Sequence, residues 1–195
     1  MSPVSSSIPP KPATVSSDDD LLILVDGNDT AIGTLDKARC HDGAGQLHRA
    51  FSLFIFNPRG DLLLQQRAIG KRLWGGYWSN SCCSHPRAAE GMEEAVSRRL
   101  AEELGLNATL QFVYKFEYHA AFGEEGSEHE LCSVYIGETH QDPSPHPEEI
   151  ERCCWISPAT LDGRMQSSPH EFTPWFRMEW HALRTQYRER LSGSC

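Results

Sequence analysis

One helical pattern set among strand patterns constrains the fold of this chain more than any other feature. Within residues 89–104, apolar side chains recur at helical spacing: Met92, Ala95, Val96, Leu100 and Leu104. Gly105 follows, where the left-handed turn that ends many helices favours glycine. Strand patterns occupy residues 21–25, 50–56, 61–66, 111–119, 131–137 and 153–156. A further helix is expected at residues 174–191. This order of mixed strands and helices predicts one α/β or α+β sandwich.

The remaining segments organise this sandwich into one unit. Residues 57–60, Asn-Pro-Arg-Gly, suit a type I turn and join the strands at 50–56 and 61–66 into a hairpin. Residues 67–86 are aromatic and are expected to be irregular. Residues 1–20 are rich in Ser and Pro, which predicts a disordered tail. No internal repeat is present, so residues 21–195 are expected to form a single domain.

Charge and composition exclude several classes of partner. The chain has 18 basic and 27 acidic residues, and this balance argues against binding to nucleic acid. A small anionic ligand remains possible, because net charge does not describe one pocket. No apolar run approaches the roughly 20 residues of a membrane span, and no signal peptide is evident. Seven cysteines include the adjacent pairs Cys82–Cys83 and Cys153–Cys154, which favour free thiols and a cytoplasmic protein. Without an exposed heptad or long apolar stripe, a monomer is expected.

Two groups of residues include side chains that could bind a metal ion. Arg98, Arg99, Glu102 and Glu103 lie on the 89–104 helix, where carboxylates on neighbouring turns suit Mg²⁺ shared with phosphates. The alternative is a solvated charged helix face. The second group is His41, His48 and His85 with the carboxylates of the Glu128-x-Glu130 segment. Alternate strand residues point the same way, and such a set suits Mg²⁺, Mn²⁺ or Zn²⁺. Spacing alone does not join these segments.

The helix resembles the signature of the Nudix superfamily, in which carboxylates hold a divalent metal against a diphosphate. Glu90 lies eight residues before Arg98, and Ser84 lies six before Glu90. Two positions depart from that signature: Ser84 stands where glycine is expected, and Arg99 stands where glutamate is expected. A cation in place of a metal ligand argues against hydrolysis and leaves the Nudix fold intact.

Ordered motifs from about residue 21 to residue 190 resemble type I isopentenyl diphosphate isomerase, a family with a modified Nudix fold. They are His41…His48, Arg67-Ala68…Lys71, Trp74-x-Gly-x-Trp-x-Asn-Ser-x-Cys83-x-His85-Pro86, Arg99…Glu103-Leu-Gly, Glu128-x-Glu130 and Phe172-x-Pro174-Trp175. The resemblance implies an α+β chain, an α/β/α sandwich in which a mixed sheet is flanked by helices. It implies a single catalytic domain that converts isopentenyl diphosphate to dimethylallyl diphosphate. The double bond moves through protonation and deprotonation, with a tertiary carbocation between them.

The resemblance also implies a role for each matched residue. Cys83, Glu130 and Tyr118 match catalytic positions. The metal ligands implied are His41, His48, His85, Glu128 and Glu130, which would hold Mn²⁺, Mg²⁺ or Zn²⁺. Glu103 matches a residue that helps hold Mg²⁺ with the diphosphate. The implied substrate contacts are Lys37, Arg67, Lys71, Arg99, Cys83 and Trp175, the last through an indole face toward the carbocation.

Two other functions stay open on the sequence. One is a Nudix hydrolase of nucleoside or other diphosphates, which Arg99 and Cys83 disfavour. The other is a non-catalytic binding module with a structural metal, which predicts no turnover at all.

Overall fold

The computed structural model describes residues 15–192, so most of the expected disordered tail lies outside the described residues. The strands are β1 (Leu21–Val25), β2 (Ala31–Asp36), β3 (His48–Phe56), β4 (Leu62–Arg67), β5 (Trp78–Ser79), β6 (Cys82–Ser84), β7 (Leu110–Phe122), β8 (Gly126–Glu138) and β9 (Ile150–Ile156). The helices are α1 (Lys37–Cys40), α2 (Met92–Leu104), α3 (Pro158–Ser167), η1 (Pro169–Glu171), α4 (Pro174–Thr185) and α5 (Arg188–Ser192). None of the helices in this range is long and apolar enough to cross a membrane.

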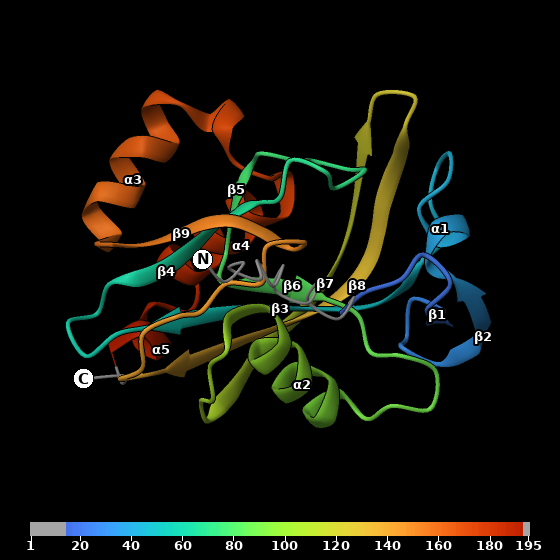
Figure 1. Ribbon diagram of the computed structural model, residues 1–195, viewed down its shortest axis with the longest axis horizontal. Coiled ribbons are helices and arrows are strands. Elements are labelled where there is room, and N and C mark those ends of the chain that lie inside the picture. Colours follow the sequence, from blue (N-terminus) through green and yellow to red (C-terminus); the bar gives the residue numbers. More distant parts are fainter. Residues whose placement is uncertain (1–14, 193–195) are drawn as a thin grey trace, which may run out of the picture.

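A single mixed sheet is organised around β3, as Figure 1 shows. β3 pairs antiparallel with β1, β4 and β6. On its other side β3 runs parallel to β8, in register from His48 opposite Glu130 to Phe56 opposite Glu138. β7 and β8 form a long antiparallel hairpin. Because parallel strands are buried on both faces, β3 reads as a nearly continuous apolar run.

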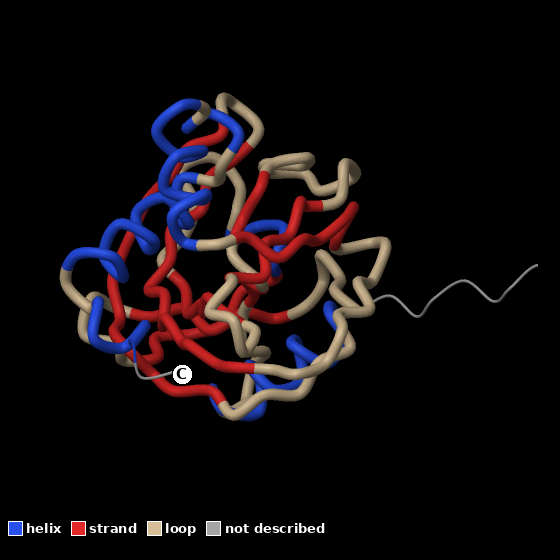
Figure 2. Tube along the Cα trace, turned by 90° about the vertical axis from the view of Figure 1, so that its left-hand side faces the viewer, coloured by secondary structure: helices blue, strands red, loops and turns tan. Residues whose placement is uncertain are grey.

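Alternation along β3 sorts its side chains between two apolar layers. Phe51, Leu53 and Ile55 pack with the α2 stripe, including Val96 and Leu100. Ala50, Phe54 and Phe56 pack on the opposite face, where α4 contributes its largest apolar side chains: Trp175, Phe176, Trp180 and Leu183. Figure 2 shows the strands lying between two groups of helices. The predicted α/β/α sandwich is confirmed.

The helix predicted at 89–104 is confirmed, with a later start. Gly105 adopts the left-handed conformation expected at the end of α2, with φ of 64°. The helix begins at Met92 because Ala89 has a φ of 64° and Gly91 is extended. Glu90 stays outside the helix and accepts hydrogen bonds from the Arg87 backbone N–H and the Arg98 guanidinium. The position that resembled a Nudix metal ligand is therefore engaged in an ion pair.

Other sequence expectations need correction. Residues 67–86 are not wholly irregular, because they contain β5 and β6, whose short length escapes a pattern search. The helix predicted at 174–191 is broken into α4 and α5, and between them Tyr187 stacks on Tyr114 with parallel rings 4.6 Å apart. α3 was not predicted, since Leu161 is its one buried residue. Its start at Ser157 and Pro158 is nevertheless a recognisable helix-start signal.

Gly126, at the start of β8, packs directly against the chain at His41. Its φ of +152° is unusual for other residues, and a Cβ built there would lie 2.3 Å from the His41 carbonyl oxygen. Ser127 N–H donates to that same oxygen at 3.0 Å. This close approach ties the segment after α1 to β8.

Gly126→Ala is therefore expected to lower the free energy of unfolding by about 1–3 kcal/mol, as overpacked substitutions do. Gly163→Ala is the matched control, because Gly163 lies within α3 with open space around it. The control is expected to raise stability by about 0.4–1 kcal/mol. Urea denaturation measures both, and equal stabilities for Gly126→Ala and the parent would contradict this packing argument.

Candidate active site and metal centre

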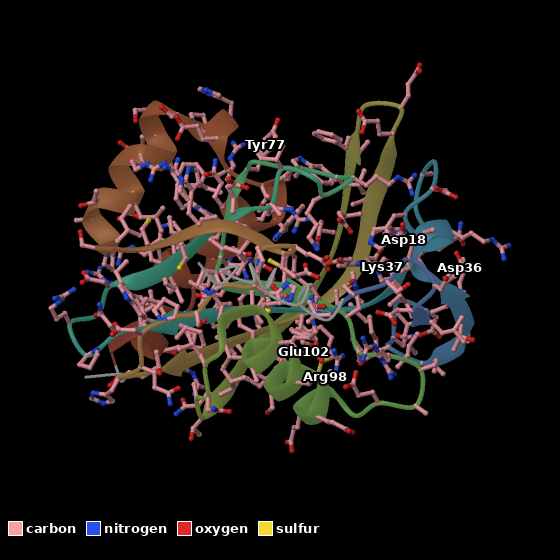
Figure 3. All side chains as sticks on the ribbon, viewed as in Figure 1. Asp18, Asp36, Lys37, Tyr77, Arg98 and Glu102 are labelled. Carbon is pink, nitrogen blue, oxygen red and sulfur yellow. The ribbon has the colours of Figure 1, made fainter. Side chains whose placement is uncertain are left out.

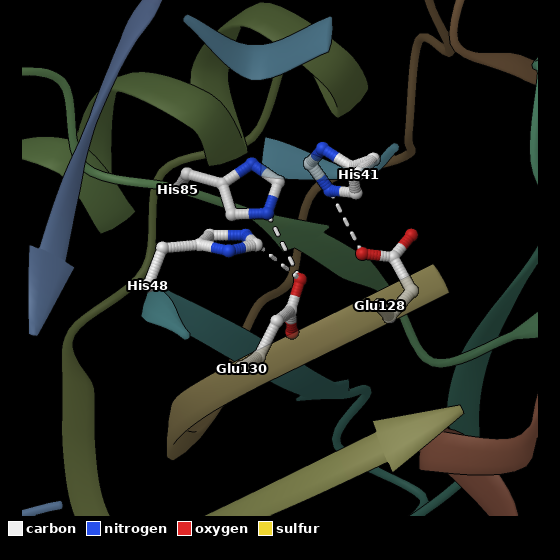
Figure 4. Close-up of side chains that lie close together, drawn as sticks. All are labelled: His41, His48, His85, Glu128 and Glu130. Carbon is white, nitrogen blue, oxygen red and sulfur yellow. Dashed lines mark hydrogen bonds and ion pairs between the residues drawn. The ribbon is translucent and has the colours of Figure 1, made fainter. Parts of the chain in front are cut away.

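Three histidines from distant segments meet at one end of the sheet. His41 follows α1, His48 opens β3 and His85 follows β6. Their ring centroids lie 4.9 Å (His41–His48), 5.3 Å (His41–His85) and 4.8 Å (His48–His85) apart. Figure 4 shows the three imidazoles converging on two carboxylates from β8. The pairing of β1, β6 and β8 with β3 brings these segments together.

The two carboxylates are Glu128 and Glu130, whose side chains leave β8 on the same side. Glu128 Oε2 lies 2.8 Å from His41 Nε2. Glu130 Oε1 lies 2.9 Å from His85 Nε2 and 3.8 Å from His48 Nε2. His129 lies between the two glutamates in the sequence and pairs elsewhere, with Glu117. The alternation of β8 therefore selects the two glutamates for the site.

This group fits a divalent metal ion. One ligand atom from each of the five residues lies within 4.8 Å of all the others. The Nδ1 atoms of His41 and His48 each lie 2.6 Å from a backbone carbonyl oxygen, an arrangement that fixes the ring and leaves Nε2 free to bind. His48 Nε2 is buried and has no hydrogen-bond partner among residues 15–192. Imidazole and carboxylate ligands together suit first-row divalent ions.

The imidazoles differ in charge because their surroundings differ. Burial lowers the pKa of His48 to about 3 and holds that of His85 well below its usual value, so both rings are neutral. Burial also lowers the pKa of His41, but the adjacent Glu128 carboxylate outweighs it and raises the pKa to about 9. Neutral imidazole is the form that binds metal, so an ion bound here would displace the proton that His41 shares with Glu128.

Cys83 lies beside this group, on β6, with three polar neighbours. Its Sγ lies 2.7 Å from Asn80 Oδ1 and 3.5 Å from Ser79 Oγ. The indole Nε1 of Trp175 donates to the same sulfur at 3.2 Å. Burial, and next the Glu179 carboxylate, raise the pKa of the Cys83 thiol to about 12. Cys83 is therefore a protonated thiol at neutral pH.

Tyr118 and Glu130 form a hydrogen-bonded pair across the β7–β8 ladder, where they are register partners. Tyr118 O–H donates to Glu130 Oε2 at 2.7 Å. Burial, assisted by the charge of Glu128, raises the pKa of Glu130 to about 7. Burial also holds the pKa of Tyr118 well above its ordinary value, so the phenol keeps its proton. This pair can hold or release a proton near neutral pH.

A cavity of about 320 Å³ joins these groups. Cys83, Trp175, Tyr118 and Glu130 line it together with basic residues. Twelve of the thirteen site residues that the resemblance implies line it: Lys37, His41, Arg67, Lys71, Cys83, His85, Arg99, Glu103, Tyr118, Glu128, Glu130 and Trp175. The thirteenth, His48, is fully buried and is not part of the lining. The Arg67 guanidinium lies 5.3 Å from the Trp175 ring centroid, and Trp74 packs edge-on against the same indole at 5.2 Å.

Two basic residues of this cavity, Arg99 and Lys71, are held by buried carboxylates. Arg99 is buried and pairs with Glu103 at 2.5 Å and with Glu149 at 3.3 Å. Lys71 also pairs with Glu149. Burial raises the pKa of Glu149, but Lys71 and Arg99 outweigh it and lower that pKa to about 2. Burial raises the pKa of Glu103 despite Arg99. The cavity therefore combines fixed cations with acids that orient them.

Sequence reasoning missed several cavity residues. Glu149 lies after the Pro-rich connection, where no periodicity marks it. Ser16 and Asp18 lie in the segment expected to be tail, yet both line the cavity. Ser16 Oγ lies 2.5 Å from Lys37 Nζ, and the Val15 carbonyl oxygen accepts from Arg99 at 2.7 Å. Figure 3 shows Asp18 next to Lys37, and Arg98 near Glu102 on α2. A domain boundary at residue 20 stays a prediction.

Comparison with known proteins identifies the fold and the family. The family model described as "NUDIX domain" matches residues 46–176. The crystal structure of DR0079 from Deinococcus radiodurans is similar in fold, with a TM-score of 0.63 and 21% identity over 76% of this chain and 90% of that one. The MutT protein from Methanosarcina mazei Go1 gives a TM-score of 0.61 and 19% identity over 72% of this chain and 95% of that one.

Relatives with higher sequence identity identify the family within this fold. "Isopentenyl-diphosphate Delta-isomerase 1" of Photorhabdus laumondii is 40% identical over 87% of this chain and 98% of the relative. The "Isopentenyl-diphosphate Delta-isomerase" of Halorhodospira halophila is 45% identical over 80% of this chain and 90% of the relative. The "Isopentenyl-diphosphate Delta-isomerase" of Serratia proteamaculans is 46% identical over 81% of this chain and 88% of the relative. On this identity and coverage, and with the Nudix fold beneath it, the chain belongs to the isopentenyl-diphosphate Delta-isomerase family.

Proposed function

We propose that this protein interconverts isopentenyl diphosphate and dimethylallyl diphosphate. The observation that carries the proposal is one cavity that holds a thiol, Cys83, and a hydrogen-bonded Tyr118–Glu130 pair beside a five-residue metal-ligand group. The reaction adds one proton to the alkene and removes another, so it needs two proton-holding groups within reach of the same substrate. The family relationship supports the same reaction.

The diphosphate of the substrate would bind to the basic residues of the cavity, Lys37, Arg67, Lys71 and Arg99. The guanidinium of Arg99 can meet phosphate oxygens in pairs, and Glu103 and Glu149 hold it in place. The hydrocarbon end would then face Cys83, Tyr118 and Trp175. An unactivated alkene is a weak base, so this fixed placement lowers the barrier to its protonation.

Proton transfer follows from the states of the two groups. Glu130 can carry a proton near neutral pH, and Tyr118 is hydrogen-bonded to it and keeps its own. We assign the second proton transfer to Cys83, whose thiol lines the same cavity from β6. A tertiary carbocation lies between the two transfers. The face of the Trp175 indole would stabilise it by roughly 1–2 kcal/mol.

The metal-ligand group would hold Mn²⁺, Mg²⁺ or Zn²⁺, and Glu103 would help to hold Mg²⁺ with the diphosphate. When bound, such ions supply positive charge that orients the ligating carboxylates and neutralises the diphosphate. We further propose a single catalytic domain at residues 21–195, a cytoplasmic monomer and no nucleic-acid or membrane partner. The small diphosphate substrate is the partner that the site favours.

A Nudix hydrolase is the competing function. Arg99, which stands where the Nudix signature has a glutamate, lies on α2 and is buried in an ion pair with Glu103. An ion pair there replaces a carboxylate pair, and this weakens the case for hydrolysis. Purified protein incubated with isopentenyl diphosphate and Mg²⁺ should yield dimethylallyl diphosphate without phosphate release.

Cys83→Ala is expected to lower turnover of isopentenyl diphosphate by roughly 10²–10⁴-fold, because one proton-transfer group is lost. Cys153→Ala is the matched control, since Cys153 lies on β9 away from this cavity. Product formation by NMR measures both, and circular dichroism checks the fold. Near-normal turnover in Cys83→Ala would refute the assigned role.

His48→Ala is expected to weaken binding of Mn²⁺ or Zn²⁺ by about 100-fold or more, because it removes a buried ligand atom. His140→Ala serves as the control, since His140 is exposed outside the group. Metal content after dialysis, by mass spectrometry, gives the result. A His48→Ala protein that retains metal as the parent does would remove His48 from the ligand set.

Arg99→Lys keeps the positive charge and loses the paired phosphate contact. It is expected to lower kcat/KM for isopentenyl diphosphate by about tenfold, chiefly through KM. Arg98→Lys is the control, because the Arg98 guanidinium pairs with Glu90 and Glu102. Equal KM values in the two variants would contradict a phosphate contact at Arg99.

A further inference from the structure

Trp74 has a strained backbone conformation, and none of the roles assigned above uses its side chain. Its φ is 50°, in the left-handed region that bulky residues rarely adopt. The residue is 3% exposed and is not part of the cavity lining. Such strain persists only where the surroundings fix a residue, and it is concentrated at functional sites. The strain at Trp74 therefore points to a functional role for its side chain.

The strained conformation is held by the loop of residues 68–76. The N–H of Arg67, just before the loop, donates to the carbonyl oxygen of Tyr77, just after it, at 2.9 Å. Inside the loop, a Cβ built on Gly75 would lie 2.6 Å from the Ile69 carbonyl oxygen. The loop is thus closed at its base, and its interior is too tightly packed for the tryptophan backbone to relax.

The ring of Trp74 contacts aromatic side chains on two elements that border the cavity. Phe122 ends β7, and its ring centroid lies 4.9 Å from that of Trp74, with the planes tilted by 47°. Trp175 lies in the first turn of α4, and its ring is 5.2 Å away and almost perpendicular, at 88°. Perpendicular rings attract because the positive edge of one meets the negative face of the other. Trp74 therefore restrains the tilt of the Trp175 indole.

The other contacts of the Trp175 indole constrain it less. Its Nε1 donates to Cys83 Sγ at 3.2 Å, but sulfur is a weak acceptor and holds only one edge of the ring. The Arg67 guanidinium, on a flexible side chain, lies 5.3 Å from the ring centroid, and the Tyr118 ring lies 6.2 Å away. A cation–π contact requires the face of the ring to be turned toward the charge. The orientation of Trp175 thus depends on the perpendicular contact with Trp74.

We propose that Trp74 is a positioning residue: its ring holds the Trp175 indole so that the indole face meets the carbocation of the reaction. The inference rests on the proposed isomerase activity. Trp74 acts only through Trp175, because its own side chain is not part of the cavity lining.

Binding of the diphosphate does not depend on the Trp74 ring, because the cations nearest to it in the sequence have bonds of their own. The Arg67 guanidinium donates to the Leu73 carbonyl oxygen at 3.1 Å. Lys71 pairs with the Glu149 carboxylate. Loss of the Trp74 ring is therefore expected to affect recognition of positive charge at the hydrocarbon end of a ligand, and to leave recognition of its diphosphate intact.

The test compares two unreactive ligands by isothermal titration calorimetry of the full chain with Mg²⁺. One is isopentyl diphosphate, and the other is its analogue in which a protonated tertiary amine replaces the branched carbon. The parent is expected to prefer the ammonium compound. Trp74→Leu should lower this preference, the ratio of the two Kd values, by about three- to tenfold because the indole face turns aside. The Kd of isopentyl diphosphate should stay close to that of the parent.

Trp155→Leu is the matched control. Trp155 packs in the apolar layer that contains α2, on the other face of the sheet, and is not part of the cavity lining. The same substitution there should leave the preference unchanged. Trp74→Phe keeps a smaller ring and should retain part of the preference. In turnover, Trp74→Leu should lower kcat with little change in KM, because the carbocation contact arises after the substrate has bound.

A preference unchanged by Trp74→Leu would overturn the proposal, and so would equal affinity of the parent for the two compounds. Equal weakening of both compounds would show a purely structural role and overturn it as well. Circular dichroism checks folding. If Trp74→Leu does not fold, Trp74→Phe is compared with Trp155→Phe, and equal preferences in these two variants would overturn the proposal.

The two proposals fail in different ways. A parent protein without isomerase activity would refute the proposed function. An active parent whose preference for the ammonium compound survives Trp74→Leu would refute only this inference.

Discussion

The parallel pairing of β3 with β8 is the interaction on which the site depends. Its register places His48 opposite Glu130, and the alternation of β8 then turns Glu128 to the same side. β6 pairs with β3 along the edge opposite β8 and so brings Cys83 and His85 to the same end of the sheet. A slip of one residue in this register would turn Glu128 and Glu130 to the opposite face of the sheet. The apolar alternation of β3 between α2 and α4 fixes the register, because both faces must be buried at once.

Burial then decides how each group in the site behaves. The same low-polarity surroundings keep His48 neutral, Cys83 protonated and Glu130 able to carry a proton near neutral pH. Two of the cavity's cations, Arg99 and Lys71, share the Glu149 carboxylate. An acidic chain can therefore present a locally basic cavity to an anionic ligand.

Much of the fold followed from pattern. The α2 stripe with its terminal Gly105 and the apolar β3 run are strong periodic signals, and both were located from them. The short strands β5 and β6 were not predicted, because they contain two and three residues and their pairing depends on distant strands. α3 has one buried residue and so little amphipathic signal.

The site, like the fold, was only partly predictable from the sequence. Resemblance, rather than spacing, joined His41, His48, His85, Glu128 and Glu130, and the structure brings all five together. The sequence did not predict Glu149 as a site residue. Glu149 reaches Lys71 and Arg99 only because β9, which follows it, pairs with β4.

The central claim is that two proton-holding groups of this cavity move the double bond of isopentenyl diphosphate. The most direct measurement is the reaction carried out in D₂O with Mg²⁺ and followed by NMR. The account predicts dimethylallyl diphosphate that carries solvent deuterium in a methyl group, with the diphosphate intact. Release of phosphate without a dimethylallyl product, or product formed without deuterium from solvent, would contradict it.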